Sequence, residues 1–187
     1  LKAAPEAIYN VTFGGDLAKF IKEGNARGLF KDRTVVSLLT GEPEYADPLG
    51  ADMPEGWIVT GYPWSKIKTP EHDAFVKAYQ AKFNDYPRLG SIVGYTWMYA
   101  AAGIIQKAGK TDTEALIAAA RGIQLKSPMG PYHFRAIDQQ STLGAYVGLT
   151  TVEGGKPTMK NWYYADGAKF MPPDDEVRKL RPADAMK

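Results

Sequence analysis

The 187-residue sequence contains no cysteine and only two histidines. The lack of cysteine excludes disulfides, thiolate metal ligands and a cysteine nucleophile. His72 and His133 lie far apart on different predicted elements, so we interpret them as surface or hydrogen-bonded residues rather than metal ligands. No apolar run approaches the roughly 18 residues that are needed to span a bilayer. The sequence therefore predicts neither a metal site nor a membrane-spanning helix.

An excess of charge of one sign is also absent. The 23 basic and 21 acidic residues are mixed along the chain and leave a formal net charge of +2. Proteins that bind nucleic acids usually carry a clustered basic face. We therefore expect no nucleic-acid partner.

The sequence lacks the common catalytic and phosphate-binding motifs. It contains no H-E-x-x-H, P-loop, G-x-S-x-G or G-x-G-x-x-G pattern. Gly90-Ser91 comes nearest to a nucleophile turn, but Gly94 lies one residue too far along the chain. Neighbouring carboxylates such as Asp174-Asp175 are typical of a solvated surface. These absences predict a protein that is not an enzyme, with no catalytic residues, no cofactor and no metal.

What is present is an ordinary globular composition with an alternating order of elements. Hydrophobic residues make up 44% of the chain and aromatic residues 12%. We expect strands at 7–13, 33–39 and 57–62, with a helix over 16–26 between the first two. The second of these strands is a nearly continuous Val/Leu run, as in strands buried on both faces. The alternation predicts an α/β fold with a parallel sheet flanked by helices.

The middle of the chain has the pattern of helices. Thr69-Pro70 predicts an N-cap followed by proline at the first helical position. A second helix is expected over 91–108. The sequence 111–114, Thr-Asp-Thr-Glu, predicts a capping box that opens a third helix ending at Gly122.

The pattern changes to β from Pro131 onward. Short strands are expected at 132–135, 145–152 and 162–164. Gly154-Gly155 separates the last two and predicts a turn.

Two strand-end turns are the candidate binding features. The turn at 12–15 follows the first strand, and the turn at 40–42 follows the second. If the two strands are adjacent and parallel, both turns lie at one edge of the sheet, where open α/β sheets bind small molecules. Together they offer an aromatic face, a hydroxyl, backbone N–H groups and the carboxylate of Glu42. The alternative is that the glycines only permit the turns and that Glu42 is solvated.

A series of short motifs then follows one another in a familiar order. They are Phe20-Ile21-Lys22 through Gly28-Leu29, Pro54 to Thr60 as the third strand, Phe75…Tyr79…Phe83 with Pro87, Gly94-Tyr95 opening a helix that ends Gln106-Lys107-Ala108-Gly109, Ser127-Pro128-Met129-Gly130 to Phe134 with Asp138, and Val147-Gly148 in a closing strand. In this order the chain resembles the C-terminal half of the branched-chain amino-acid type of periplasmic binding protein. This is the type I solute-binding component of ABC transporters.

The resemblance implies a fold of two α/β lobes with a ligand between them. Residues 1–62 and 136–187 are similar to one lobe's sheet and its closing strands, and residues 63–135 to helices of the other lobe. The sheet of that other lobe precedes residue 1 in the family, so we expect a fragment of a larger protein. The middle helices then have an apolar face without a sheet to cover, which predicts possible self-association of the fragment.

The resemblance also implies a function. It predicts capture of a small amino acid or a carboxylated organic ligand and its delivery to an ABC permease in the membrane. One alternative is a ligand-sensing regulatory domain of the same fold. A third option is an enzyme, which would need a nucleophile or a metal site in the half of the family fold that precedes residue 1. A periplasmic location is implied; residue 1 is not methionine and no signal-peptide pattern follows it, so we expect that the original N-terminus has been removed.

The family's cleft and crossing segments map onto specific positions of this sequence. The implied ligand-binding residues are Phe13, Gly14, Thr40, Gly41, Glu42, Ile92 and Tyr95, and the implied hinge residues are Tyr62, Pro63 and Trp64.

Overall fold

The computed structural model describes residues 5–181, and within them the chain divides into two compact units. Unit 1 comprises residues up to 67 together with 145–165. Unit 2 comprises 68–144 together with the residues from 166 on. The assignment of 63–135 to a second lobe concerns the whole protein and stays a prediction.

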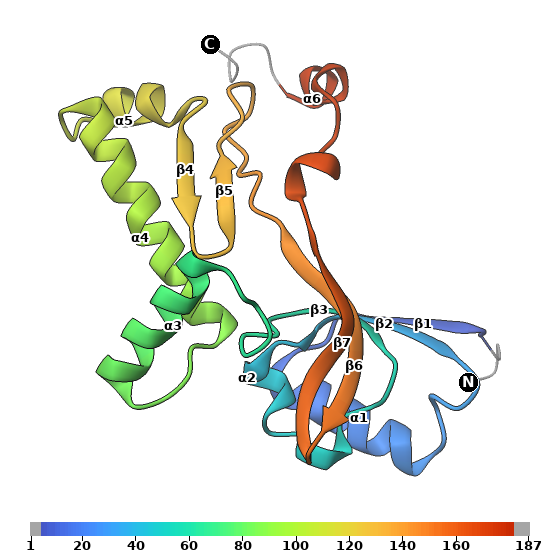
Figure 1. Ribbon diagram of the computed structural model, residues 1–187. Helices are drawn as coiled ribbons and strands as arrows, with labels where there is room; N and C mark the ends of the chain where they lie inside the picture. Colours follow the sequence, from blue (N-terminus) through green and yellow to red (C-terminus); the bar gives the residue numbers. More distant parts are fainter. Residues whose placement is uncertain (1–4, 182–187) are drawn as a thin grey trace. The chain divides into compact units, whose positions relative to one another are not determined.

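Unit 1 is built on a five-stranded sheet with the strand order β1-β2-β3-β6-β7 (Figure 1). The β1–β2 and β2–β3 pairs are parallel, whereas β3–β6 and β6–β7 are antiparallel. The predicted α/β fold with its parallel sheet is therefore confirmed, with two antiparallel strands added at one side. The elements of unit 1 are β1 (Ala7–Asn10), α1 (Gly14–Ala26), β2 (Thr34–Gly41), α2 (Pro43–Ala46), a 3-10 turn (Gly50–Asp52), β3 (Ile58–Gly61), β6 (Ala145–Glu153) and β7 (Lys156–Ala165).

Strand β1 is shorter than the sequence pattern predicts. It ends at Asn10 instead of residue 13. The Asn10 side-chain oxygen accepts hydrogen bonds from the Thr12 amide at 3.2 Å and from the Thr12 hydroxyl at 2.8 Å. An asparagine that bonds to the backbone two residues ahead turns the chain out of the sheet. This turn releases Phe13 from the strand before α1 begins.

Strand β7, in contrast, is longer than the predicted 162–164. It begins at Lys156 and pairs with β6 over nearly its whole length. The two glycines of the connecting turn, Gly154 and Gly155, have φ angles of +58° and +77°. A two-residue turn with both φ values positive matches the twist of a hairpin, so pairing starts directly after it.

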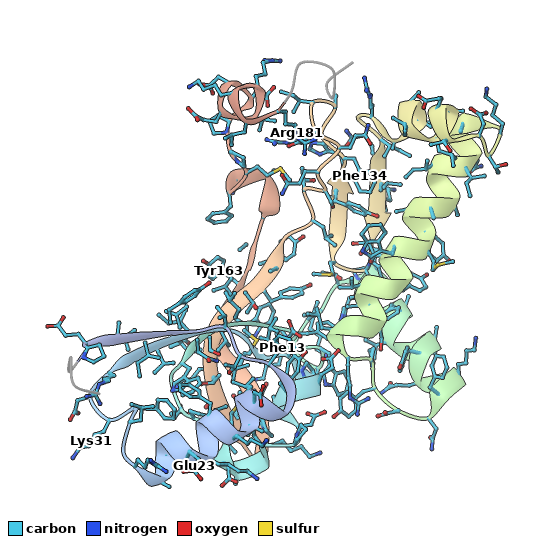
Figure 2. All side chains as sticks on the ribbon, turned by 180° about the vertical axis from the view of Figure 1, so that it is seen from behind. Phe13, Glu23, Lys31, Phe134, Tyr163 and Arg181 are labelled. Atoms are coloured by element: carbon cyan, nitrogen blue, oxygen red, sulfur yellow. The ribbon has the colours of Figure 1, made fainter. Side chains whose placement is uncertain are left out.

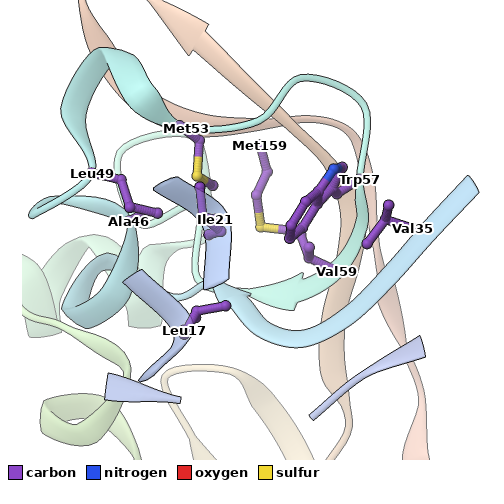
Figure 3. Packing of buried hydrophobic residues seen from close by; sticks show 9 residues of the cluster. All are labelled: Leu17, Ile21, Val35, Ala46, Leu49, Met53, Trp57, Val59 and Met159. Atoms are coloured by element: carbon purple, nitrogen blue, oxygen red, sulfur yellow. The ribbon is translucent and has the colours of Figure 1, made fainter. Parts of the chain in front are cut away.

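The core of unit 1 lies where α1 and the turn after α2 pack on the sheet (Figure 3). The largest aromatic in it is Trp57, which is 3% exposed and packs edge-on against the Phe30 ring at 4.7 Å between centroids. The buried members of this cluster are Leu17, Ile21, Val35, Ala46, Leu49, Met53, Trp57, Val59 and Met159.

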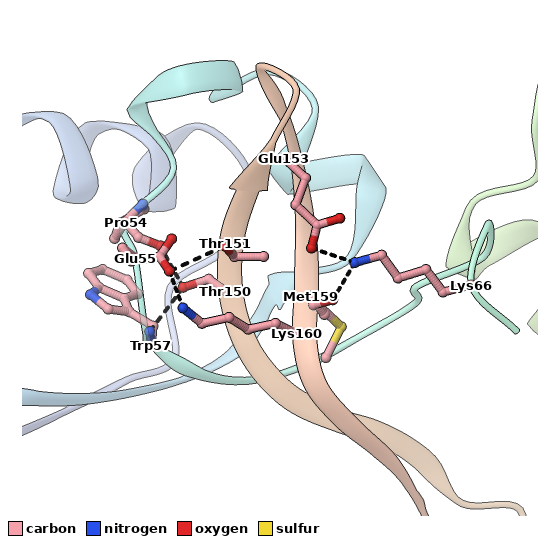
Figure 4. Close-up of polar contacts among 9 residues, drawn as sticks. All are labelled: Pro54, Glu55, Trp57, Lys66, Thr150, Thr151, Glu153, Met159 and Lys160. Atoms are coloured by element: carbon pink, nitrogen blue, oxygen red, sulfur yellow. Dashed lines mark hydrogen bonds and ion pairs between the residues drawn. The ribbon is translucent and has the colours of Figure 1, made fainter.

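Polar contacts fasten the loop before β3 to the strand β6 (Figure 4). The buried Thr150 hydroxyl donates to the Pro54 carbonyl at 2.5 Å and accepts from the Trp57 amide at 2.9 Å. Nearby, Lys160 pairs with Glu55 at the surface. Because Thr150 satisfies backbone groups that the loop would otherwise bury unpaired, its loss should lower stability.

Unit 2 contains four helices and one hairpin among its described residues. Thr69 caps the first helix as predicted, since its hydroxyl accepts from the His72 amide at 3.3 Å. The sequence pattern did not indicate β4, which pairs antiparallel with β5 inside the segment expected to be helical. The elements are α3 (Pro70–Phe83), α4 (Leu89–Ala108), α5 (Thr113–Ala120), β4 (Gln124–Ser127), β5 (Gly130–His133), a 3-10 turn (Gly167–Lys169) and α6 (Asp174–Leu180).

The predicted capping box at 111–114 is wrong by one residue. The N-cap of α5 is Asp112, whose carboxylate accepts from the Ala115 amide at 3.1 Å. Aspartate competes at least as well as threonine for this position, and its charge also favours a helix N-terminus. Thr111 therefore lies outside the helix.

Replacing the Asp112 cap should cost stability where replacing Thr111 does not. We expect Asp112→Ala to lower the free energy of unfolding of unit 2 by about 1 kcal/mol, because a helix amide loses its acceptor. Thr111→Ala is the matched control and should change it by less than about 0.5 kcal/mol. Urea unfolding followed by far-UV circular dichroism measures both, and a larger effect of Thr111→Ala would contradict the observed cap.

Within residues 5–181, none of the helices combines the length and the apolar character that crossing a membrane requires. Over the same residues, no group of three His, Asp or Glu side chains is arranged to hold a metal ion.

Candidate functional site

The carboxyl ends of β1 and β2 lie at one edge of the sheet in unit 1. The two strands pair in parallel, from Ala7 opposite Thr34 to Asn10 opposite Ser37. The adjacency on which the predicted juxtaposition of the two turns depends is therefore confirmed. Phe13, Gly14, Thr40, Gly41 and Glu42 follow these strand ends, and their contact with a ligand stays a prediction.

Phe13 is the exposed member of this edge (Figure 2). It occupies the N-cap position of α1, and its side chain is 63% exposed. Gly14 has a φ of +59°, and a Cβ added there would meet nothing within 4 Å. A single exposed aromatic side chain is ordinary on a protein surface. What distinguishes Phe13 is its place beside an open glycine turn at the edge where α/β sheets bind ligands.

Buried polar side chains lie behind this exposed turn. Asn10 is 5% exposed, and Ser37 and Thr40 are fully buried. The Asn10 amide nitrogen donates to the Ser37 hydroxyl at 2.8 Å, and the Ser37 and Thr40 hydroxyls lie 2.6 Å apart. Sequence reasoning selected Thr40 but missed Asn10 and Ser37. A polar residue within each of two otherwise apolar strands is the signal that could have indicated them.

Glu42 places a carboxyl group at the same edge, almost out of contact with solvent. It is 9% exposed and precedes Pro43, the first residue of α2. Its amide donates to the Leu39 carbonyl at 3.1 Å, which fixes the backbone. Burial, and secondarily the nearby charge of Glu44, raises the pKa of Glu42 to about 7. At neutral pH this carboxyl can therefore be either a neutral donor or an anion.

The raised pKa predicts that ionisation of Glu42 destabilises the fold. An unfolded glutamate loses its proton near 4.5 and this folded one near 7, so between these values the folded state holds more protons. Stability contributed by neutral Glu42 is therefore lost as the pH rises through this window. We expect Glu42→Gln to be more stable than the wild type by about 1 to 3 kcal/mol at pH 8 and nearly equal at pH 5.

Urea unfolding at the two pH values measures this difference. Glu6→Gln, at an exposed position of the same unit, is the control. A stabilisation by Glu42→Gln that is the same at pH 5 and pH 8 would contradict the effect of burial on this carboxyl.

Two glycines make the close approach of β2 and β3 possible at this edge. Gly41 lies opposite Gly61 after a shift in the strand register. A Cβ added to Gly61 would lie 2.2 Å from the Gly41 carbonyl oxygen, and one added to Gly41 would lie 2.6 Å from the Thr60 carbonyl oxygen. The backbone that carries Glu42 is therefore held by a contact that only glycine permits.

The other predicted residues occupy different surroundings. Ile92 and Tyr95 lie on α4 in unit 2, where Ile92 is fully buried and Tyr95 is 40% exposed. Tyr95 packs against the rings of Phe75 and Tyr99 at 5.0 and 4.6 Å between centroids. Their contact with a ligand stays a prediction.

The predicted hinge residues precede the first passage of the chain from unit 1 to unit 2. Tyr62 is buried, and its amide donates to the Gly41 carbonyl at 3.1 Å. The Trp64 amide donates to the Tyr62 carbonyl at 2.8 Å. Pro63, between them, is buried. A hinge function of this segment stays a prediction.

Two surface depressions lie away from these residues. One, of about 610 Å³, is lined in unit 1 by residues around Gly24 and Gly28 at the end of α1. The other, of about 590 Å³, is lined in unit 2 by residues including His133 and Arg135. Neither includes a predicted ligand-binding residue.

Comparison with known proteins finds similar solved structures. No curated protein sequence matches it. Among solved structures it is similar to the leucine-, isoleucine-, valine-, threonine- and alanine-binding protein of Brucella ovis in its closed conformation, with 19% identity, a TM-score of 0.74, and coverage of 92% of this chain and 46% of that one.

Two structures from Rhodopseudomonas palustris are also similar. An ABC-type branched-chain amino acid transporter protein has 24% identity and a TM-score of 0.69, over 89% of this chain and 45% of that one. A solute-binding protein of an ABC transporter in complex with 4-hydroxybenzoate has 20% identity and a TM-score of 0.73, over 95% of this chain and 49% of that one. The chain thus spans about half the length of these structures.

A family model described as periplasmic binding protein matches residues 1–156. This match confirms the resemblance that the order of the sequence motifs indicates. The chain belongs to the periplasmic binding protein family.

Proposed function

We propose that this chain is part of the solute-binding component of an ABC importer. It captures a small amino acid or a carboxylated organic molecule and delivers it to a membrane permease, without catalysis and in the periplasm. The observation that carries the proposal is that the exposed Phe13 and Gly14 turn and the buried Glu42 follow the carboxyl ends of two adjacent parallel strands. Family membership and the named relatives, which are described as parts of ABC transporters, support transport over sensing.

The ligand class depends on the state of Glu42. An ionised Glu42 would hold the ammonium group of an amino acid through a charge-assisted hydrogen bond. A neutral Glu42 would instead tolerate a carboxylate, and Phe13 would offer aromatic surface to an aromatic acid. Relatives of both kinds exist, since one is described as binding leucine and related amino acids and another is in complex with 4-hydroxybenzoate. We favour the amino acid, because a carboxylate that is almost shielded from solvent can bind an ammonium group through a charge-assisted hydrogen bond.

Isothermal titration of the intact protein with L-leucine and with benzoate tests the proposal. We expect saturable binding of one probe. If it is L-leucine, Glu42→Gln should weaken it by about tenfold or more, since a charged hydrogen bond is lost. Benzoate should bind this variant at least as well as the wild type. Glu6→Gln is the control for a remote loss of charge. If Glu42→Gln changed the affinity for neither probe, Glu42 would not belong to the site. If the protein bound neither probe but converted a substrate into a product, the proposed function would be wrong.

We further propose that the helices of residues 63–135 pack against a second lobe in the whole protein. Helix α4 supports this with large apolar side chains that are exposed in the described structure. Trp97 is 67% exposed, Met98 71%, Tyr99 58% and Ile105 44%. Several large apolar side chains exposed on one helix are typical of an interaction surface.

Without such a lobe the same exposed side chains should drive self-association. We expect the 187-residue chain alone to sediment as oligomers at high concentration, and Trp97→Lys to shift it towards monomer. Lys107→Glu, a charge change near the end of the same helix, is the control. A wild-type chain that is monomeric at every concentration would contradict the proposed packing role of this face.

A further inference from the structure

The buried hydrogen bonds behind the candidate site connect the ends of both strands. Asn10 lies on β1, and Ser37 and Thr40 lie on β2. The Asn10 side chain contacts Thr12 on one side and Ser37 on the other, and Ser37 contacts Thr40. Asn10, Ser37 and Thr40 are each at most 5% exposed. We call the four hydrogen-bonded residues Asn10, Thr12, Ser37 and Thr40 the strand-end network.

The orientation of the Asn10 amide follows from its partners. The Thr12 backbone amide can only donate, so the group that faces it at 3.2 Å is the Asn10 oxygen. The Asn10 nitrogen therefore faces Ser37 and donates to it at 2.8 Å. A carboxylate could accept from Thr12 but could not donate to Ser37, so the hydrogen bond to Ser37 would have to reverse and a charge would be buried.

The Asn10 oxygen contacts the residue before the Phe13 turn, and the Asn10 nitrogen contacts the strand that ends at the Glu42 turn. Thr12 immediately precedes Phe13, so the contact with Thr12 sets where the chain turns toward α1. Thr40 precedes Gly41 and Glu42, so the contact through Ser37 sets the end of β2. Buried polar groups are costly to leave unpaired, so the network holds its geometry firmly.

We propose that Asn10 is a positioning residue for ligand binding, which fixes the Phe13 turn and the Glu42 turn relative to each other. This role rests on the proposed function. Sites lose much of their affinity when supporting hydrogen bonds allow small displacements. Asn10→Asp keeps the side-chain shape and the contact with Thr12 but loses the donor to Ser37.

Calorimetric titration of the intact protein with L-leucine and with benzoate tests this role. We expect Asn10→Asp and Ser37→Ala each to weaken the bound probe by about tenfold. The double variant should be little weaker than either single one, because both remove the same connection. Should Asn10→Asp fail to fold, Ser37→Ala alone still tests the network.

Thr150→Val is the matched control, because Thr150 is equally buried and makes two hydrogen bonds elsewhere in unit 1. It should lower the melting temperature without changing probe affinity. A wild type that binds neither probe overturns the proposed function and this role with it. A wild type that binds, with an affinity that Asn10→Asp and Ser37→Ala change no more than Thr150→Val does, overturns the role of Asn10 alone.

Discussion

Replacing Trp57 with alanine is expected to lower the free energy of unfolding of unit 1 by about 3 to 5 kcal/mol. Trp57 is 3% exposed, and its ring packs against Phe30 and Phe20 at 4.7 and 6.5 Å between centroids. The backbone around it is fixed by mutual hydrogen bonds with Thr150, so the surrounding residues cannot collapse into the space. Truncation therefore leaves a cavity in the centre of the cluster, and the lost contacts are not replaced.

Urea unfolding measures this loss, with hydrogen exchange of the β3 and β6 amides to assign it to unit 1. Phe170→Ala is the matched control, since Phe170 is 72% exposed and its truncation should change stability by less than about 0.5 kcal/mol. If the Trp57 variant were no less stable than the Phe170 variant, the described core would be wrong.

Replacing Gly61 with alanine should have the second-largest effect, because it acts on backbone. The added Cβ would lie 2.2 Å from the Gly41 carbonyl oxygen and 2.5 Å from the Met159 sulfur. A flexible side chain could move aside, but the paired strand β2 cannot do so without breaking its register. We expect a loss of about 1 to 3 kcal/mol or more from overpacking. The displaced Gly41 also carries Glu42, so ligand affinity should fall with stability.

Gly94→Ala is a control of the opposite sign. Gly94 lies inside α4, where a Cβ would meet nothing within 4 Å. Alanine there should stabilise the helix by about 0.5 to 1 kcal/mol. Thermal unfolding of both variants separates the two effects. A Gly61→Ala protein as stable as the wild type would show that β2 and β3 do not approach each other as described.

Much of the fold follows from local patterns in the sequence. The Val/Leu run of β2 and the Thr69-Pro70 start of α3 each have a strong local cause, and both are confirmed. Boundaries were harder to predict where a side chain redirects the backbone. Asn10 ends β1 early through its bonds to Thr12, and Asp112 takes the cap from Thr111. In both cases the hydrogen bonds of one side chain decide between patterns that composition leaves nearly equal.

Strand β4 shows a different reason why an element cannot be predicted from its own sequence. Its residues Gln124–Ser127 include two with long polar side chains and have little hydrophobic alternation. The strand forms because β5 supplies its partner and because the Ser127 hydroxyl, which donates to the Gly130 carbonyl at 2.9 Å, closes the turn. Such pairing information lies in the partner strand and is not visible in the segment itself.

Some residues of the candidate site can likewise be recognised from local sequence, whereas others depend on strand pairing. Glycine turns and Glu42 stand out in the sequence because glycine marks a turn and because Glu42 is a charged residue directly after an apolar run. Asn10 and Ser37 acquire their importance only when β1 and β2 pair, since they lie 27 positions apart. Nothing local indicates that a buried amide on one strand bonds a hydroxyl on the next.

Amide chemical shifts of the intact, isotope-labelled protein during titration with L-leucine and with benzoate test the central claim most directly. The account predicts that one of these probes saturates and that the largest changes fall on Gly14, Gly41 and Glu42, with smaller changes on the exposed surface near Gly24 and Gly28. Saturable binding that leaves Gly14, Gly41 and Glu42 unchanged, or that changes mainly the surface near Gly24 and Gly28, would contradict a ligand site at the carboxyl edge of β1 and β2.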